Sequence, residues 1–430
     1  MKRLTTAGIG IALAASVELT GCGNDAGGGS GDSGKVYVTL VNHVWTENIK
    51  SVIPEFEKDT GIKVEYTQMG EDQLSDQYNV KLNAGSSELD VMMYRPLQEG
   101  KLFAQNGWMY DLTSYVKQNA EWDWADYQPG PVEATTFEGK VVGVPIITER
   151  QALYYRKDLL AASGFTAPPK TMEELEAMAK KISEDNPGIA GFVARTGRAA
   201  AVTQFSSFLF SYGGDFDNGS GTATLNTPEA QAAYEMYGGL INKYGPQNVS
   251  TDMSWSEAMA IFTQGLAAFY PEADVLYKNA TDPEKSKISD VVGFAQFPAG
   301  PAGSYTYNIP SWALGINGAS KNADNAWKFI EYVTNKTQDL KNFQDGVTSA
   351  RTSSWENPDA TKQFPADLAE ASLASAKTGI GHDRPIVIKV PQAREIVGQP
   401  IVDGITGKDV AASLVTAQKE YQAFLDSEKK

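Results

Sequence analysis

Short apolar runs alternate with stretches of helical spacing over the first third of the chain. Val36–Val41 predicts a buried strand, and the apolar residues from Ile49 to Phe56 then recur every three or four positions, which predicts a helix ending at Gly61. Ile62–Tyr66 and Leu89–Tyr94 predict two more strands with a helical stretch between them. This alternation favours an α/β fold whose parallel or mixed sheet carries helices on its faces.

The rest of the chain is richer in predicted helices. Thr171 with Glu174 and Ser254 with Glu257 form capping boxes, and Thr227-Pro228 marks the start of a helix that Gly245 ends. Strands of a second sheet are predicted over residues 189–195 and 266–270, and further helices over 323–334, 367–376 and 409–425.

The length of 430 residues predicts more than one domain. A single hydrophobic core stops growing at about 250 to 300 residues. With 42% hydrophobic and 21% charged residues, the composition is that of a globular chain able to fill large cores.

Charge and metal-binding residue types exclude several classes of protein. The 37 Lys and Arg against 53 Asp and Glu give a net charge of −16, which argues against a nucleic-acid partner because phosphates would be repelled. Cys22 is the single cysteine, so a disulfide framework is excluded. His43 and His382 are the two histidines, so a multi-histidine metal site is excluded and we expect no metal and no cofactor.

The N-terminus has the pattern of a targeting segment. Lys2 and Arg3 precede a short apolar run, and Leu19-Thr20-Gly21-Cys22 resembles a bacterial lipobox, in which the cysteine is lipidated. We therefore interpret residues 1–21 as a lipoprotein signal peptide and 22–34 as a lipid anchor with a flexible Gly/Ser linker. The alternative is an ordinary signal peptide followed by a buried structural cysteine. The lipobox interpretation places the protein on the extracytoplasmic face of the bacterial cell membrane.

Several segments carry a resemblance that extends over nearly all of the remaining chain. They are VIPEFEKDTGIKVEY from Val52, LDVMMYRP from Leu89, GVPIITERQALYYRKDLL from Gly143, PPKTMEELEAMAKKI from Pro168, FTQGLAAFYPEAD from Phe262, KNADNAWKFIEYVTN from Lys321 and ITGKDVAASLVTAQKEY from Ile405. In this order the chain resembles the extracellular solute-binding proteins of bacterial ABC importers, in the carbohydrate-binding group related to maltose-binding protein.

The resemblance implies a two-lobed, periplasmic-binding-protein-like (type II) fold with a ligand cleft and a hinge between the lobes. Lobe 1 would comprise residues 35–145 plus 271–325, and lobe 2 residues 146–270 plus 326–430. Such a protein would act as a monomer without catalysing a reaction. It would capture a carbohydrate or polyol by lobe closure and deliver it to the transmembrane subunits of an ABC permease.

A sugar site needs aromatic platforms beside polar groups that accept and donate hydrogen bonds. Ligands of open α/β sheets bind beyond the carboxyl ends of strands, so the residues that follow each predicted strand are the first candidates. Trp45 is the stacking candidate there, with Glu71, Tyr94 and Arg95 as polar candidates. The structural alternatives are a core tryptophan, a first-turn acid for Glu71 and a surface ion pair for Arg95.

Later candidates depend mainly on the resemblance. Glu149 matches a cleft position of related binders, although Glu149 and Arg150 could equally form a hinge ion pair. Trp312 matches a recurrent aromatic of the family's central cleft, with core packing as the alternative. The remaining candidates are Arg198, Glu272, Asp274 and Arg351.

Two other functions stay open at this point. The adjacent Tyr154 and Tyr155, together with the negative net charge, would suit a cation or polyamine binder on the same fold. A glycoside hydrolase needs only two carboxylates, which histidine scarcity does not exclude.

Overall fold

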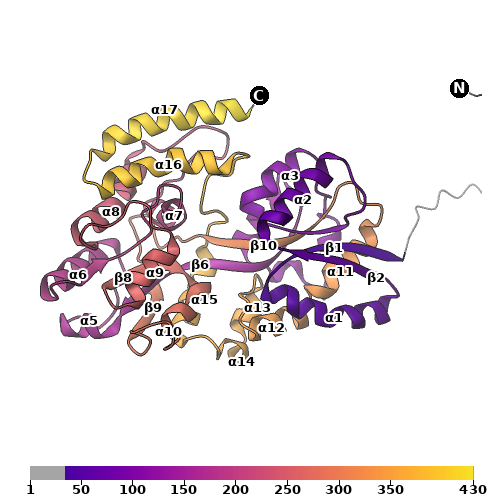
Figure 1. The fold of residues 1–430 in the computed structure, drawn as a ribbon, viewed down its shortest axis with the longest axis horizontal. Coiled ribbons are helices and arrows are strands. Elements are labelled where there is room, and N and C mark those ends of the chain that lie inside the picture. The colour runs from indigo at the N-terminus through magenta and orange to yellow at the C-terminus, as the bar shows by residue number, and fades with distance from the viewer. Residues whose placement is uncertain (1–33, 430) are drawn as a thin grey trace, which may run out of the picture.

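Two lobes lie side by side in the computed structural model, which describes residues 34–429 (Figure 1). The signal peptide, Cys22 and nearly all of the expected linker lie outside the described residues. The two-lobed α/β architecture expected from the sequence is confirmed.

A single mixed sheet runs through both lobes in the order β2-β1-β3-β10-β6-β8-β7, with β9 also paired to β6. The expectation of a separate second sheet was wrong, because β6 is long enough to serve both lobes. Residues 144–150 of β6 pair with β10, whereas residues 151–156 pair with β8 and β9. The strands of this sheet are β1 (Lys35–Val41), β2 (Lys63–Met69), β3 (Val91–Tyr94), β6 (Val144–Arg156), β7 (Ala190–Phe192), β8 (Ala267–Ala273), β9 (Val292–Gln296) and β10 (Asn308–Ile316).

The lobe that contains β1 is built on one apolar cluster between the sheet and its helices. Helix α1 begins after His43, whose Nδ1 accepts the Trp45 N–H at 3.0 Å, and ends at Gly61, whose φ of 72° favours glycine. Besides strands of the main sheet, this lobe contains α1 (Val44–Thr60), α2 (Glu71–Asn83), η1 (Pro96–Gly100), α3 (Lys101–Gln105), η2 (Tyr115–Lys117), η3 (Trp124–Asp126), α4 (Pro129–Ala134), β4 (Thr136–Phe137) and β5 (Lys140–Val141).

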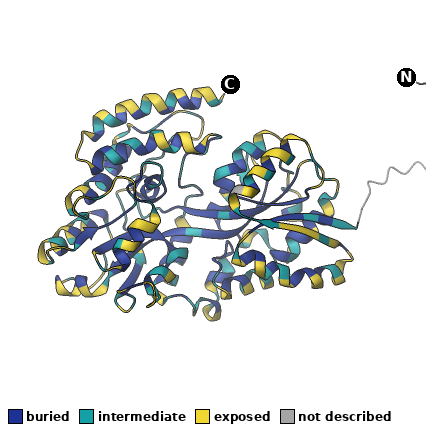
Figure 2. Cartoon of the chain, in the orientation of Figure 1, coloured by how far each residue is buried: buried dark blue, intermediate teal, exposed yellow. Residues whose placement is uncertain are grey.

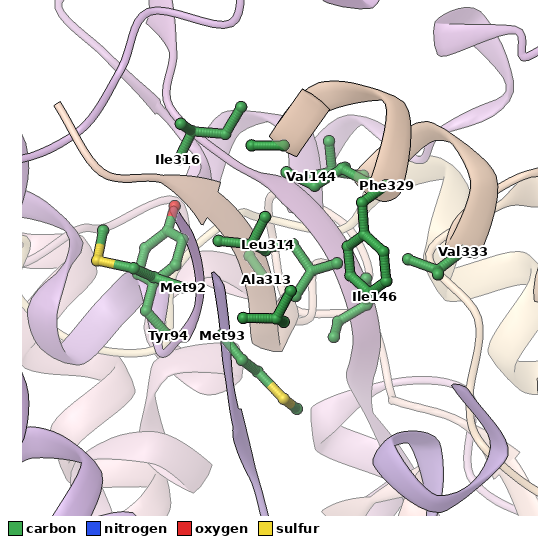
Figure 3. Packing of buried hydrophobic residues seen from close by; sticks show 14 of the residues in the cluster. Met92, Met93, Tyr94, Val144, Ile146, Ala313, Leu314, Ile316, Phe329 and Val333 are labelled. Atoms are coloured by element: carbon green, nitrogen blue, oxygen red, sulfur yellow. The ribbon is translucent and has the colours of Figure 1, made fainter. Parts of the chain in front are cut away.

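Helix α11 (Ala323–Val333) belongs to this same core. Phe329 and Val333 pack with Leu314 of β10 and Ile146 of β6 (Figure 3). The Phe329 ring also meets Phe56 of α1 edge-on, with ring centroids 5.4 Å apart. The sequence-based division gave residues 326–430 to lobe 2, whereas these contacts place α11 in the lobe that contains β1.

The other lobe packs helices from the middle and the end of the chain around β7, β8 and the second part of β6. The expected N-caps are present: Thr171 and Thr227 accept backbone N–H groups, and Ser254 forms a capping box with Glu257. The box expected for Thr171 is half formed, because Glu174 accepts the backbone N–H of Lys170 and not that of Thr171. Its helices are α5 (Lys157–Ala162), α6 (Met172–Asp185), α7 (Ala201–Ser211), α8 (Pro228–Tyr244), α9 (Trp255–Thr263), η4 (Asp274–Leu276), α10 (Lys278–Thr281), α15 (Ala366–Thr378), α16 (Val390–Ile405) and α17 (Val410–Glu428).

Strand β6 connects the two lobes, and nearly all of its residues are buried. Figure 2 shows β6 buried along almost its whole length, including the crossing between the lobes. Three short helices, α12 (Lys336–Gln344), α13 (Thr352–Glu356) and α14 (Pro358–Thr361), lie below this junction in Figure 1. Between residues 34 and 429, no helix has both the length and the apolar character that crossing a bilayer requires.

Candidate functional site

A pocket of about 390 Å³ is lined by residues of both lobes. Arg95 lies between β3 and η1, Gln98 lies within η1, and Ser311 comes from β10. Glu149 lies where β6 crosses between the lobes. The other lobe supplies the remaining charged, hydroxyl and aromatic side chains: Arg195, Thr203, Trp255, Asp383, Arg384 and Arg394.

Arg195 follows β7 and is held by a buried carboxylate. Its Nε donates to Glu272 Oε2 at 3.0 Å and its Nη2 to Glu272 Oε1 at 2.5 Å. Glu272 also accepts the Tyr270 hydroxyl at 2.7 Å and the Gln204 amide at 2.9 Å. Burial opposes the charge of Arg195, but Glu272 outweighs burial and raises the Arg195 pKa. The network therefore fixes a charged guanidinium at the pocket wall.

A second network connects the segment before α16 to α7. Arg384 donates from Nε and Nη2 to the two carboxylate oxygens of Asp383, each at 2.5 Å. Thr203 donates to Asp383 at 2.6 Å and accepts from Arg394 Nη2 at 3.0 Å. Burial opposes the negative charge of Asp383, but Arg384 outweighs it and lowers the pKa of Asp383 to about 2.

Arg394 lies on α16 beside this network. Its Nε donates to the carbonyl oxygen of Ala199 at 2.9 Å, so both of its hydrogen bonds within the described residues go to uncharged oxygens. Burial, followed by repulsion from Arg384, lowers the pKa of Arg394 to about 9. Even so, the group is cationic at neutral pH.

The pocket also offers hydroxyl-binding and stacking groups. Glu149 accepts a hydrogen bond from the Ser311 hydroxyl, and burial raises the pKa of Glu149. The side chain of Trp255, the first residue of α9, is 40% exposed and lines the pocket. An exposed tryptophan beside a carboxylate and a serine can stack on the C–H face of a sugar while the oxygens bind its hydroxyls.

The sequence of the chain matches the family model for bacterial extracellular solute-binding proteins over residues 43–339. The chain belongs to this family. A probable ABC transporter-binding protein of Deinococcus radiodurans is 32% identical over 263 residues, covering 60% of this chain and 61% of that protein. The alignment therefore spans less than two thirds of that relative.

Two solved solute-binding proteins share the fold over almost their whole lengths. MalE3 of T. maritima, solved with maltose, is 28% identical with a TM-score of 0.71 and covers 90% of this chain and 100% of its own. A solute-binding protein of an ABC transporter from Agrobacterium radiobacter, solved with ribitol, is 26% identical with a TM-score of 0.72 and covers 91% and 98%. Both matches support the two-lobed fold of this solute-binding protein.

Several of the ten sequence-predicted site residues lie in or beside the pocket of this solute-binding protein. Arg95 and Glu149 line it directly. Glu71 accepts from Arg95 Nη1 at 3.2 Å, and the Arg95 guanidinium lies 5.8 Å from the ring centre of Trp312, which is 5% exposed. Glu272 pairs with the lining residue Arg195, as described above.

Trp45, Tyr94 and Arg198 lie elsewhere. Trp45 is 2% exposed because α1 begins at Val44 and turns Trp45 into the core, so it offers no face to a ligand. Tyr94 is fully buried, with its hydroxyl against Gly143. Arg198 is partly exposed and pairs with Glu395 at 3.4 Å.

Asp274 and Arg351 do not line the pocket but take part in buried ion pairs. Asp274 accepts from the backbone N–H and Nε of Arg150 at 3.0 and 2.9 Å, which makes Arg150 the partner in a buried ion pair at the crossing. Arg351 is fully buried, donates to Asp126 at 3.2 Å and lies over the Tyr127 ring at 4.2 Å.

Sequence reasoning missed most of the second lobe's contribution. Arg195 ends a predicted strand, so the rule that located Arg95 could have found it. Trp255 directly follows the N-cap Ser254, so an aromatic residue at a predicted helix start could have been proposed as a stacking candidate. Arg384 had no local signal, because the segment before α16 has no periodic pattern, and Arg394 lies on α16, a helix that the sequence analysis did not predict.

The adjacent tyrosines lie outside the pocket lining. Tyr154 is fully buried and donates its hydroxyl to the Ala273 carbonyl oxygen at 2.5 Å. Across residues 34–429, no group of three or more His, Cys, Asp or Glu side chains is placed to hold a metal ion.

Proposed function

We propose that the protein is the substrate-binding component of an ABC importer and captures a carbohydrate or polyol between its lobes. The observation that carries the proposal is the pocket itself, which both lobes line with an exposed tryptophan, a carboxylate, a serine hydroxyl and four arginines. The relatives support the ligand class, since the solved neighbours hold maltose and ribitol.

Closure of the lobes would bring the two walls onto the ligand. In this mechanism Arg95, Glu149 and Ser311 bind hydroxyls from one side, while Trp255 stacks on the ligand and Arg195 binds it from the other. The closed form is the one that the permease would recognise. One chain contains a complete pocket, so we infer that the monomer is sufficient.

The same geometry favours binding over glycoside hydrolysis. Of the two carboxylates that line the pocket, Asp383 is held by both oxygens in its pair with Arg384. A carboxylate so engaged is poorly placed to act as a nucleophile or to transfer a proton. Incubation with aryl glycosides and oligosaccharides should therefore give no turnover, and measured hydrolysis would refute the proposal.

Lipidation at Cys22 would hold the mature protein on the outer face of the cell membrane. The sequence pattern alone supports this part of the proposal. Cys22→Ala should release the protein from the membrane fraction of cells, whereas continued sedimentation with membranes would refute the anchor.

Thermal unfolding of the mature protein against a panel of neutral sugars, acidic sugars, polyols, spermidine and ferric ion tests the ligand class. A ligand at a hundred times its Kd stabilises the native state by about 2.7 kcal/mol. For a chain of this size that corresponds to a shift in Tm of about 3 °C. A shift with one carbohydrate class supports the proposal. A shift with spermidine or ferric ion alone would replace it with the cation-binding alternative.

A further inference from the structure

We infer that the ligand is an acidic carbohydrate, a sugar or polyol that carries one carboxylate, and that this carboxylate binds Arg394. The inference rests on the proposed function and names the substrate class of the same pocket.

Four arginines line the pocket, and three of them already hold a carboxylate. Arg95 pairs with Glu99 at 2.7 Å, Arg195 with Glu272 at 2.5 Å and Arg384 with Asp383 at 2.5 Å. Arg394 differs, because no carboxylate of the described residues lies within ion-pair distance of its guanidinium.

The free position on Arg394 can be assigned to one nitrogen. Nε and Nη2 donate to the Ala199 carbonyl and the Thr203 hydroxyl, so Nη1 has no protein acceptor within the described residues. Arg384 likewise uses only Nε and Nη2 for Asp383, which leaves its own Nη1 available. Two guanidinium donors in one pocket can together bind a planar anion such as a carboxylate.

The accumulation of positive charge here is costly unless an anion offsets it. Arg195, Arg384 and Arg394 lie close enough to repel one another, in a protein whose net charge is −16. Asp383 attracts Arg394 but is already paired with Arg384, so a neutral sugar that excluded water on lobe closure would leave the Arg394 cation desolvated with no carboxylate in direct contact. A carboxylate on the ligand removes that penalty.

The other residues that line the pocket limit how much negative charge the ligand can carry and which other chemical groups it presents. Asp383 and Glu149 also face the pocket, so a phosphate dianion would meet more repulsion than a single carboxylate. Glu149 and Ser311 supply groups for hydroxyls, and Trp255 supplies an apolar face. Together these groups fit a uronic or aldonic acid.

Isothermal titration of the mature protein with matched pairs tests the inference directly. The pairs are glucuronate with glucose, galacturonate with galactose, and gluconate with glucitol, with glucose 6-phosphate as the dianion. We expect one acid to bind at least tenfold more tightly than its neutral counterpart and than the phosphate. Arg394→Gln should weaken binding of that acid at least tenfold and abolish its advantage, whereas Arg156→Gln, which removes a partly buried arginine outside the pocket, should not.

The other outcomes distinguish failure of the acidic-ligand inference from failure of the proposed function. If a neutral sugar or polyol binds as tightly as its acid, the acidic-ligand inference is overturned and the proposed function stands. Preference for the phosphate overturns the carboxylate assignment, again without touching the transport role. Binding of no carbohydrate, neutral or acidic, overturns both. If Arg394→Gln fails to fold, the matched pairs on the unsubstituted protein decide alone.

Discussion

Glu272 holds the Arg195 guanidinium through two hydrogen bonds, one to each carboxylate oxygen, 3.0 and 2.5 Å long, and is itself completely buried. Two further donors, the Tyr270 hydroxyl and the Gln204 amide, fix the carboxylate in place. Buried side chains thus position a cation at the pocket wall, and among residues 34–429 the Nη1 of Arg195 has no hydrogen-bond acceptor.

Glu272→Gln should weaken ligand binding at least tenfold, about 1.4 kcal/mol, because Arg195 loses its counter-charge and its fixed orientation. The measurement is a titration with the ligand identified in the unfolding panel, performed well below the Tm of the variant. Glu65→Gln is the matched control, because it neutralises a carboxylate of the exposed Lys35–Glu65 pair. Unchanged affinity in Glu272→Gln would remove the network from the binding machinery.

Trp255→Ala should also weaken binding at least tenfold while costing under about 1 kcal/mol of stability, since exposed side chains contribute little to folding. Tyr66→Ala, which removes a 44% exposed aromatic from β2, controls for the loss of a surface ring. A Trp255→Ala protein with normal affinity would show that the ligand does not stack there.

In contrast to Trp255→Ala, Trp312→Ala should lower the stability of the folded protein strongly. Trp312 is 5% exposed within the first apolar cluster, and truncating a buried tryptophan costs about 3–5 kcal/mol. Urea unfolding measures that loss. If Trp312→Ala is as stable as the unsubstituted protein, Trp312 does not have the core role that its burial indicates.

Local signals predicted several helix ends of this fold but not its central strands β6 and β10. Gly61, Thr171, Thr227 and Ser254 marked helix ends that the structure confirms, because capping depends on residues a few positions apart. The lobe to which α11 belongs depends instead on where the chain returns after β10, which no neighbouring residue encodes.

The site was only partly predictable for a similar reason. Arg95 comes directly after β3, where a general rule of α/β sheets applies. Glu149 lies in the middle of β6, and the family resemblance, not that rule, pointed to it. The same rule misplaced Trp45, because His43 caps α1 so early that Trp45 already faces the core. Arg384 and Arg394 reach the pocket from the far end of the chain, through tertiary packing against α7.

Asp274→Asn should destabilise the protein by about 3–5 kcal/mol, because it leaves Arg150 charged and buried without a counter-charge. The Arg150 guanidinium also lies 4.0 Å from the ring centre of Trp355, and this cation–π contact connects the β6 crossing to α13. Urea unfolding of the unliganded protein measures the loss. Asp359→Asn, which breaks an exposed pair with Lys362, should change stability by less than about 1 kcal/mol. Equal effects of the two substitutions would contradict a structural role for the crossing pair.

The two histidines should make opposite contributions to the pH dependence of stability. His382 Nε2 lies 3.0 Å from Asp215 Oδ1, next to the pocket residues Asp383 and Arg384. Burial disfavours its charge, but Asp215, with smaller contributions from Glu133 and Asp383, outweighs burial and raises the His382 pKa above 6.5. The stabilisation from His382 is therefore complete at a pH below the unfolded-state pKa and is lost as the pH rises through the folded-state pKa.

His43 has the reverse sign, because burial lowers its pKa below 6.5. Its neutral ring accepts the Trp45 N–H at the start of α1, so its contribution is present above the unfolded-state pKa and is lost as the pH falls. Urea unfolding from pH 5 to pH 9 should show the stability advantage of the unsubstituted protein over His382→Gln shrinking as pH rises. The advantage over His43→Gln should shrink as pH falls. If the two difference curves have the same slope, the ion pair between His382 and Asp215 does not stabilise the folded protein.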